Sequence, residues 1–311
     1  MTVSPALFAF GVPVVLFAIF WTLCYGPLAG VVRVAKLGGK FGGAALARSS
    51  FGKWAIARAG SWASYAPILL VVLLGGLAAF GAGSLFVDLA EQFRLTTSRV
   101  YRYDQAIHTW VGHERANAVT TLFSTATAIG GSGGMALMVL IVAGILLVRK
   151  ERASAIFVVV TAIGGGILNT ALKMLFARAR PDVASAIAVA RWYSFPSGHA
   201  MISFIACGAL SYIVLRQKWP WVLKSAALAL ALTLVVLIGV SRVYLGVHWA
   251  SDIAGGWSAG IVWLAAAVVA FEMLLRLRAR RRGAAPAPPA ADVPDEPVPP
   301  GPPGPPQPAT T

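Results

Sequence analysis

Three short polar clusters interrupt otherwise apolar sequence, and their residue types suit the transfer of a phosphate group. The first cluster holds Lys173 and Arg180, the second is the tetrapeptide at 196–199, and the third contains His248 and Asp252. An ionisable side chain at membrane depth is costly unless it is paired or lines a wet cavity. A set of cations, imidazoles and a carboxylate therefore indicates a functional site.

His248 and Asp252 are the candidate nucleophile and its orienting acid. They lie four residues apart, so on a helix their side chains would meet on one face. The carboxylate can then hold the Nδ1–H of the imidazole while Nε2 points outward. The same pairing also occurs as a structural capping contact, and the other two clusters favour the catalytic interpretation.

The tetrapeptide Pro196-Ser197-Gly198-His199 predicts an anion-binding turn at the start of a helix. The first N–H groups of a helix have no partner within it, and the helix dipole is positive at that end. Gly198 would let a phosphate approach closely, and His199 adds an acid or base. The plainer alternative is that Ser197 is an ordinary N-cap.

Lys173, Arg180 and Arg242 are candidate ligands of the phosphate oxygens. Lys173 and Arg180 lie about two helical turns apart on roughly one face, so both can reach one ligand. Snorkelling to lipid headgroups is the alternative for each cation alone. It is our interpretation of Arg178 and Arg191.

A metal site is the rival use of the two histidines and the aspartate. No dense carboxylate or thiolate cluster accompanies them in the sequence, and the nearby cations would repel a divalent ion. We therefore expect no metal and no other cofactor. Cys24 and Cys207 each lie in an apolar run and are interpreted as small hydrophobic residues.

Membrane helices are the elements that must position these residues. Hydrophobic residues make up 58% of the 311-residue chain and charged residues 12%, with a mean hydropathy of +0.75. The apolar runs are long enough to cross a bilayer as helices, and they lack the alternation of a membrane β-barrel. The expected fold class is all-α, a polytopic membrane helix bundle.

Seven spans are expected, and the three polar clusters fall at outward-facing ends of the later ones. A long external segment at 89–131 separates the second span from the third. The spans are predicted at 6–26, 66–88, 132–148, 154–176, 199–216, 223–240 and 250–274.

The net charge of +15 is explained by topology rather than by nucleic acid. Most Lys and Arg residues lie in short segments at 31–60, 149–152, 216–224 and 276–282. The positive-inside rule assigns such segments to the cytoplasm. We expect a multi-pass protein of the inner (plasma) membrane, with its active site facing outside, a cytoplasmic C-terminus and no nucleic-acid partner.

Three parts follow along the chain. Residues 1–60 hold an extra N-terminal span and a basic cytoplasmic linker, and residues 61–275 form the six-helix core. Residues 276–311 are a basic stop followed by a proline-rich tail, whose composition predicts disorder.

Together the clusters closely resemble the membrane lipid phosphatase branch of the type 2 phosphatidic acid phosphatase and vanadium-dependent haloperoxidase superfamily. The family signature has a lysine before Arg-Pro, then Pro-Ser-Gly-His, then Ser-Arg with a later His and Asp. This chain matches it at Lys173, Arg180, Pro181, Pro196, Ser197, Gly198, His199, Ser241, Arg242, His248 and Asp252.

The resemblance implies a role for each matched residue. His248 would attack phosphorus and form a phosphohistidine, Asp252 would orient it, and His199 would protonate the leaving oxygen and then activate water. The oxygens of the phosphate would be held by Lys173, Arg180 and Arg242 and by N–H donors at Ser197 and Gly198.

The expected activity is metal-independent hydrolysis of a lipid phosphate or prenyl diphosphate through a phosphohistidine at the outer face. The spans argue against a water-soluble haloperoxidase. Transfer to a lipid acceptor and non-catalytic carriage of a lipid headgroup are the alternatives. The generic Leu, Val and Ala of the spans do not select among undecaprenyl diphosphate, phosphatidylglycerophosphate, phosphatidate and lipid A phosphate.

Overall fold

The computed structural model describes residues 18, 66–113, 117–181, 186–188 and 192–283. Several predictions lie outside this part of the chain. They are the first span at 6–26 apart from Ala18, the basic segment at 31–60, the proline-rich tail after 283, Cys24 and Arg191.

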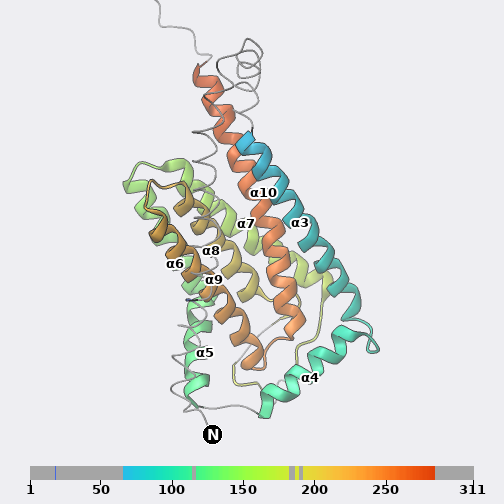
Figure 1. Ribbon diagram of the computed structural model, residues 1–311. Helices are drawn as coiled ribbons and strands as arrows, with labels where there is room; N and C mark the ends of the chain where they lie inside the picture. The colour runs from blue at the N-terminus through green and yellow to red at the C-terminus, as the bar shows by residue number, and fades with distance from the viewer. Residues whose placement is uncertain (1–17, 19–65, 114–116, 182–185, 189–191, 284–311) are drawn as a thin grey trace, which may run out of the picture. The chain divides into compact units, whose positions relative to one another are not determined.

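Every regular element in the described part is an α-helix, which confirms the all-α fold class (Figure 1). Five helices are long and apolar enough to cross a membrane: α3, α7, α8, α9 and α10. The helices are α3 (Ala66–Gln92), α4 (Arg99–His113), α5 (Asn117–Gly130), α6 (Ser132–Val148), α7 (Arg152–Phe176), α8 (Gly198–Arg216), α9 (Trp221–Tyr244) and α10 (Ala250–Gly283).

The third predicted span, at 132–148, corresponds to α6 but does not stand alone. Only together are α5 and α6 long and apolar enough for a membrane span, and they are bent by 54° at Gly131. The segment predicted as external at 89–131 contains α4 and α5, and α5 would extend the third span if it forms one bent span with α6. Hydropathy did not predict α5 as part of a span, because several threonines lower its mean hydropathy. Two of them, Thr121 and Thr125, donate their hydroxyls to carbonyls of the preceding helical turn.

The chain divides into two compact units, Met1–Glu272 and Met273–Thr311, and all the site residues belong to the first. Within this unit α8 packs against both α7 and α9, while α9 also packs against α5. The inward face of α8 is fully covered, with Met201 and Ile205 both at 0% exposure. The buried face of α8 therefore fixes the helix that carries His199.

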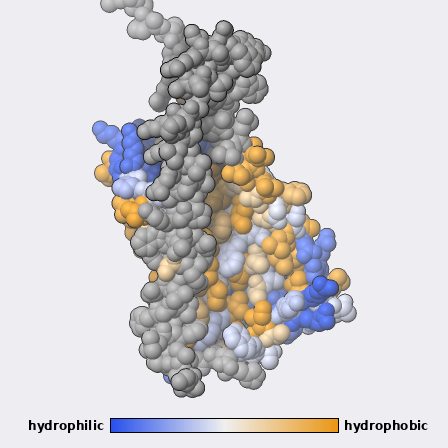
Figure 2. All heavy atoms as spheres, in the orientation of Figure 1, coloured by the Kyte–Doolittle hydropathy of each residue, from blue (hydrophilic) through white to orange (hydrophobic). Residues whose placement is uncertain are grey.

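Large apolar side chains remain exposed on the outer faces of the helices. Leu73, Leu77 and Phe80 of α3 are 67%, 67% and 75% exposed. On the face drawn in Figure 2, apolar side chains cover much of the described surface, and hydrophilic ones gather toward its ends. Such a surface suits contact with hydrocarbon, in agreement with a multi-pass membrane protein.

Two glycines let the start of α10 approach the start of α8. A Cβ on Gly256 would lie 2.8 Å from the carbonyl oxygen of Ser197, and one on Gly255 would lie 2.4 Å from the ring of Phe195. Both distances are too short for a real side chain. This close contact brings the third polar cluster against the second.

Candidate active site

One cavity of about 560 Å³ brings the three polar clusters together. Its volume lies within the range of about 300–1,000 Å³ that is usual for small-molecule sites. The predicted residues that line it are Lys173, Arg180, Gly198, His199, Arg242 and His248. Small residues also line it, namely Gly130, Ser132, Gly166 and Thr170.

Asp252 lies behind the cavity, where it holds the ring of His248. Nδ1 of His248 is 3.1 Å from Oδ2 of Asp252, and the two residues are 3% and 0% exposed. His248 precedes α10, so the two do not meet across a helical turn as predicted. Asp252 instead folds back to accept the N–H of Trp249 at 2.9 Å, which is the geometry of a helix cap.

Arg180 fixes the protonation state of the His248 ring. Its Nη1 lies 3.1 Å from Nε2 of His248. A guanidinium only donates hydrogen bonds, so Nε2 must present its lone pair, and Nδ1 carries the proton toward Asp252. The ring is thus held as the neutral tautomer that a nitrogen nucleophile requires.

The electrostatic surroundings of His248 favour the same neutral form. Burial lowers the pKa of His248 to about 4; its hydrogen bond with Asp252 opposes this shift, and the Arg180 and Lys173 cations add to it. Burial also lowers the pKa of Arg180, and Asp252 opposes that shift. At neutral pH the ring of His248 is therefore unprotonated at Nε2.

The segment before α8 folds around the two cations of the first cluster. Lys173 donates to the carbonyl of Tyr193 at 2.7 Å, and Arg180 donates to the carbonyls of Trp192 and Val247 at 2.9 and 2.7 Å. α7 ends at Phe176 with Ala177 in the left-handed conformation, φ 45°. Lys173 and Arg180 therefore converge through a loop rather than along one helix face as predicted.

Arg242, in the last turn of α9, also lines the cavity. It is 5% exposed and its Nη1 donates to the hydroxyl of Thr127 in α5. Its Nε has no hydrogen-bond partner among the described residues. A buried guanidinium with unused donor capacity suits an anionic ligand.

His199 and Gly198 open α8 at the cavity. Gly198 is the first helical residue, so its N–H has no acceptor within the helix. Space is tight there, because a Cβ would lie 3.0 Å from Oδ1 of Asn169 and that side chain would have to shift slightly. The His199 ring faces the bend between α5 and α6, where its Nε2 would lie 3.7 Å from a Cβ on Gly131.

Ser197 does not reach the cavity, in contrast to the role predicted for it. Its N–H donates to the carbonyl of Asp252 at 3.0 Å. Its hydroxyl is buried without a hydrogen-bond partner in the described structure. Ser197 is the N-cap of α8 by position, but it ties α8 to α10 rather than offering a donor to a ligand.

The interpretation of Arg178 as a headgroup-binding residue is wrong. Its side chain is 8% exposed and forms ion pairs with Asp104 and Asp252 at 2.8 and 2.6 Å. Ser194 also donates to Asp252, and Ser251 donates to Asp104. Sequence spacing gave no signal for these contacts, because Asp104 lies 74 residues from Arg178.

Comparison with known proteins identifies relatives of this arrangement. Residues 154–276 match the PAP2 superfamily. The chain is 31% identical to phosphatidylglycerophosphatase B of Bacillus subtilis over 169 residues, covering 53% of this chain and 82% of the relative. It is 28% identical to undecaprenyl-diphosphatase of Sulfolobus acidocaldarius over 149 residues, covering 46% of this chain and 68% of the relative.

A solved structure has a similar fold. It is the crystal structure of a transmembrane PAP2-type phosphatidylglycerolphosphate phosphatase from Bacillus subtilis. The TM-score is 0.58 at 27% sequence identity, and the match covers 63% of this chain and 96% of the other.

Proposed function

Because the chain belongs to the PAP2 superfamily, we propose that it is a membrane phosphatase that hydrolyses a lipid phosphate or diphosphate. We take residues 61–275 as its core. The observation that carries the proposal is the placement of His248 at the cavity, with Nδ1 3.1 Å from Oδ2 of Asp252 and Nε2 3.1 Å from Nη1 of Arg180.

In the first half of the reaction, Nε2 of His248 attacks phosphorus and the bond from phosphorus to the leaving oxygen breaks. His199 gives its proton to that oxygen, so the lipid leaves as a neutral alcohol or a shorter phosphate. The ring of His248 becomes a positively charged phosphohistidine. Asp252, hydrogen-bonded to Nδ1, stabilises that charge.

In the second half, His199 takes a proton from water as the water oxygen attacks phosphorus. The bond from phosphorus to Nε2 then breaks, and His248 returns to its neutral form. Lys173, Arg180 and Arg242 hold the oxygens of the transferred group, where negative charge spreads in the transition state. The N–H of Gly198 adds a donor, and these cations make a metal unnecessary.

We propose that the site faces the outside of the inner membrane and that the C-terminus is cytoplasmic. The basic cluster Arg149, Lys150 and Arg152 lies at the start of α7, and Lys173 lies near its other end. A transmembrane α7 therefore puts the cavity on the side opposite these basic residues. The positive-inside rule supports the cytoplasm for the basic side.

The test is phosphate release by wild type and His248→Ala in detergent micelles, with EDTA present. Phosphatidylglycerophosphate, undecaprenyl diphosphate, phosphatidate and lipid A phosphate are compared as substrates. Wild type should release phosphate from at least one, and the variant should lose about 10³-fold or more of that rate. Labelled phosphate should appear on the wild-type protein in acid-labile form and be absent from the variant.

The two alternative functions give different results in the same assay. A lipid phosphotransferase would yield a phosphorylated acceptor in place of free phosphate. A headgroup carrier would bind the lipid without turnover, and His248→Ala would leave that binding intact. Full activity of the folded variant would overturn the proposed nucleophile.

A further inference from the structure

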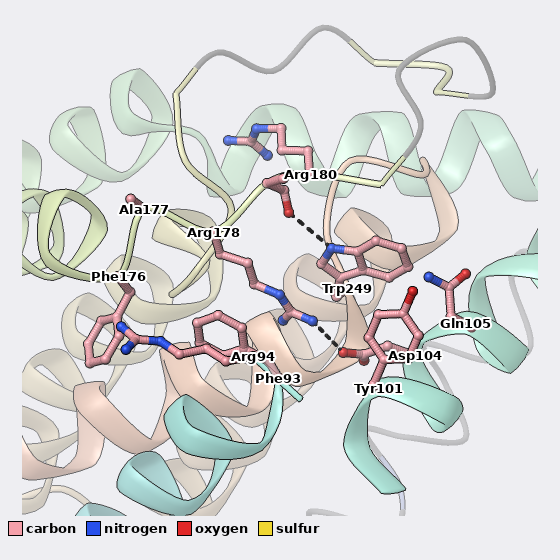
Figure 3. A pocket seen from close by; sticks show the side chains of 11 residues that line it. Phe93, Arg94, Tyr101, Asp104, Gln105, Phe176, Ala177, Arg178, Arg180 and Trp249 are labelled. Carbon is pink, nitrogen blue, oxygen red and sulfur yellow. Dashed lines mark hydrogen bonds and ion pairs between the residues drawn. The ribbon is translucent and has the colours of Figure 1, made fainter. Parts of the chain in front are cut away.

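Arg178 forms a buried charge bridge behind His248. Its guanidinium pairs with Oδ1 of Asp252 at 2.6 Å and with Oδ2 of Asp104 at 2.8 Å. Figure 3 shows the side chain extending past Phe93 toward Asp104, while Arg180 leaves the loop in the opposite direction. Neither Arg178 nor Asp104 lines the cavity that holds His248.

Asp104 also fixes the first turn of α10. Its Oδ1 accepts the N–H of Ser251 at 2.9 Å, and its Oδ2 accepts the hydroxyl of the same residue. The first N–H groups of a helix need outside acceptors, and here α4 supplies one to α10. The position of Asp252, the next residue, is thereby tied to α4.

The charges in this cluster do not cancel. Two carboxylates, Asp104 and Asp252, surround one guanidinium, Arg178, which leaves one net negative charge next to the neutral ring of His248. The ring gains a positive charge when Nε2 attacks phosphorus. With Asp104 neutral, Arg178 would offset the charge of Asp252 and weaken its attraction for that ring, strongly so in a buried site.

We propose that Asp104 and Arg178 are positioning residues that align Asp252 and maintain one net negative charge behind His248. The inference rests on the proposed function, since it assigns these residues to the same reaction. Neither residue touches the reacting atoms. They act through Asp252.

The proposal predicts opposite pH effects for the two residues. Apart from Asp252 of α10, the ring of His248 faces the cations Arg180 of the loop and Lys173 of α7, with His199 of α8 nearby. Asp104→Asn removes a negative charge, so the acid limb of kcat/KM should move to lower pH. Arg178→Gln removes a positive charge, so the limb should move to higher pH, each by about half a unit or more.

The steady-state constants give a second readout. Both single variants should lower kcat about 10- to 100-fold with KM nearly unchanged, because the phosphate ligands remain in place. The double variant Asp104→Asn/Arg178→Gln restores the net charge, so its acid limb should return to the wild-type position. Gln105→Ala, on the same helix, should match wild type. Thermal unfolding in detergent gives the folded fraction of each variant, and each rate is divided by that fraction.

A purely structural role predicts a different pattern, with greater damage in the double variant and no opposite pH shifts. Shifts in the same direction, or a wild-type kcat in folded Asp104→Asn, would overturn the inference. Where neither single variant folds, a kcat of the double variant within about twofold of wild type would overturn it.

Asp252→Asn separates this inference from the proposed function. It should lose about 10⁴-fold in kcat, as expected when the group that orients a catalytic histidine is neutralised. Retained activity there would refute the proposed mechanism itself. Loss there together with wild-type behaviour in Asp104→Asn would refute only the role of the charge bridge.

Discussion

Arg242 of α9 donates a hydrogen bond to the hydroxyl of Thr127 in α5. The contact lies close to the bend between α5 and α6 and joins two segments separated by more than 100 residues. It anchors a buried guanidinium that lines the cavity.

Thr127→Val should therefore weaken the binding of the phosphate by Arg242. Loss of one hydrogen bond to a buried charged group costs about 1–3 kcal/mol, so kcat/KM should fall about tenfold or more. Thr125→Val is the matched control, since that exposed hydroxyl bonds only to its own helix. Equal activity of Thr127→Val and wild type would show that Arg242 does not depend on this contact.

The pH dependence of kcat/KM should reflect the low pKa of His248. The ring acts as a nucleophile only when neutral, so activity falls as pH drops through its pKa. Since burial lowers that pKa to about 4, the acid limb should lie well below pH 6.5, the ordinary value for histidine. A limb at or above pH 6.5 would contradict the neutral, buried ring described here.

Arg180→Lys should strongly reduce activity although it keeps the positive charge. Arg180 contacts three carbonyl oxygens and Nε2 of His248, and a lysine ammonium cannot reproduce that fork. We expect kcat/KM to fall about 10²- to 10³-fold. Arg94→Lys is the control for a cation outside the catalytic cavity and should retain near-normal activity. Similar losses in both variants would indicate a general effect of the substitution.

Gly256→Ala should push the start of α10 away from the start of α8. The added Cβ would lie 2.8 Å from a backbone oxygen of Ser197, which cannot move as a flexible side chain can. Such overpacking costs about 1–3 kcal/mol, so thermal unfolding should occur at lower temperature and phosphate release should decline.

Gly144→Ala in α6 is the matched control for that substitution. No atom lies within 4 Å of the Cβ it would add, so its stability should equal or exceed that of wild type. If Gly256→Ala behaved like Gly144→Ala, the close approach of α8 and α10 would not constrain the site.

The long apolar spans could be predicted because hydropathy over about 20 residues carries a strong signal. α7, α8 and α9 begin and end within a few residues of the predicted limits. α4 could not be predicted as a site element, since its importance depends on one carboxylate that meets Arg178 only in three dimensions. Sequence spacing carries no information on such a distant contact.

The pairing of His248 with Asp252 was predicted, but its geometry was not. The sequence suggested one turn of helix, whereas His248 lies in the bend before α10 and Asp252 caps that helix. Arg178 and Arg180 show the same limitation. Two arginines separated by one residue look alike in sequence, yet one is buried behind Asp252 and the other contacts Nε2 of His248.

Small residues line the same cavity as the reacting side chains. Gly130, Ser132, Gly166 and Thr170 form no hydrogen bond or ion pair with Asp252 or Arg178 in the described part of the chain, yet they line the cavity that holds His248. Larger side chains at Ser132, Gly166 and Thr170 would change which headgroup fits, and a Cβ on Gly166 would meet no atom within 4 Å. A scaffold of this kind can diversify its substrates by substitution of small lining residues without rebuilding its chemistry.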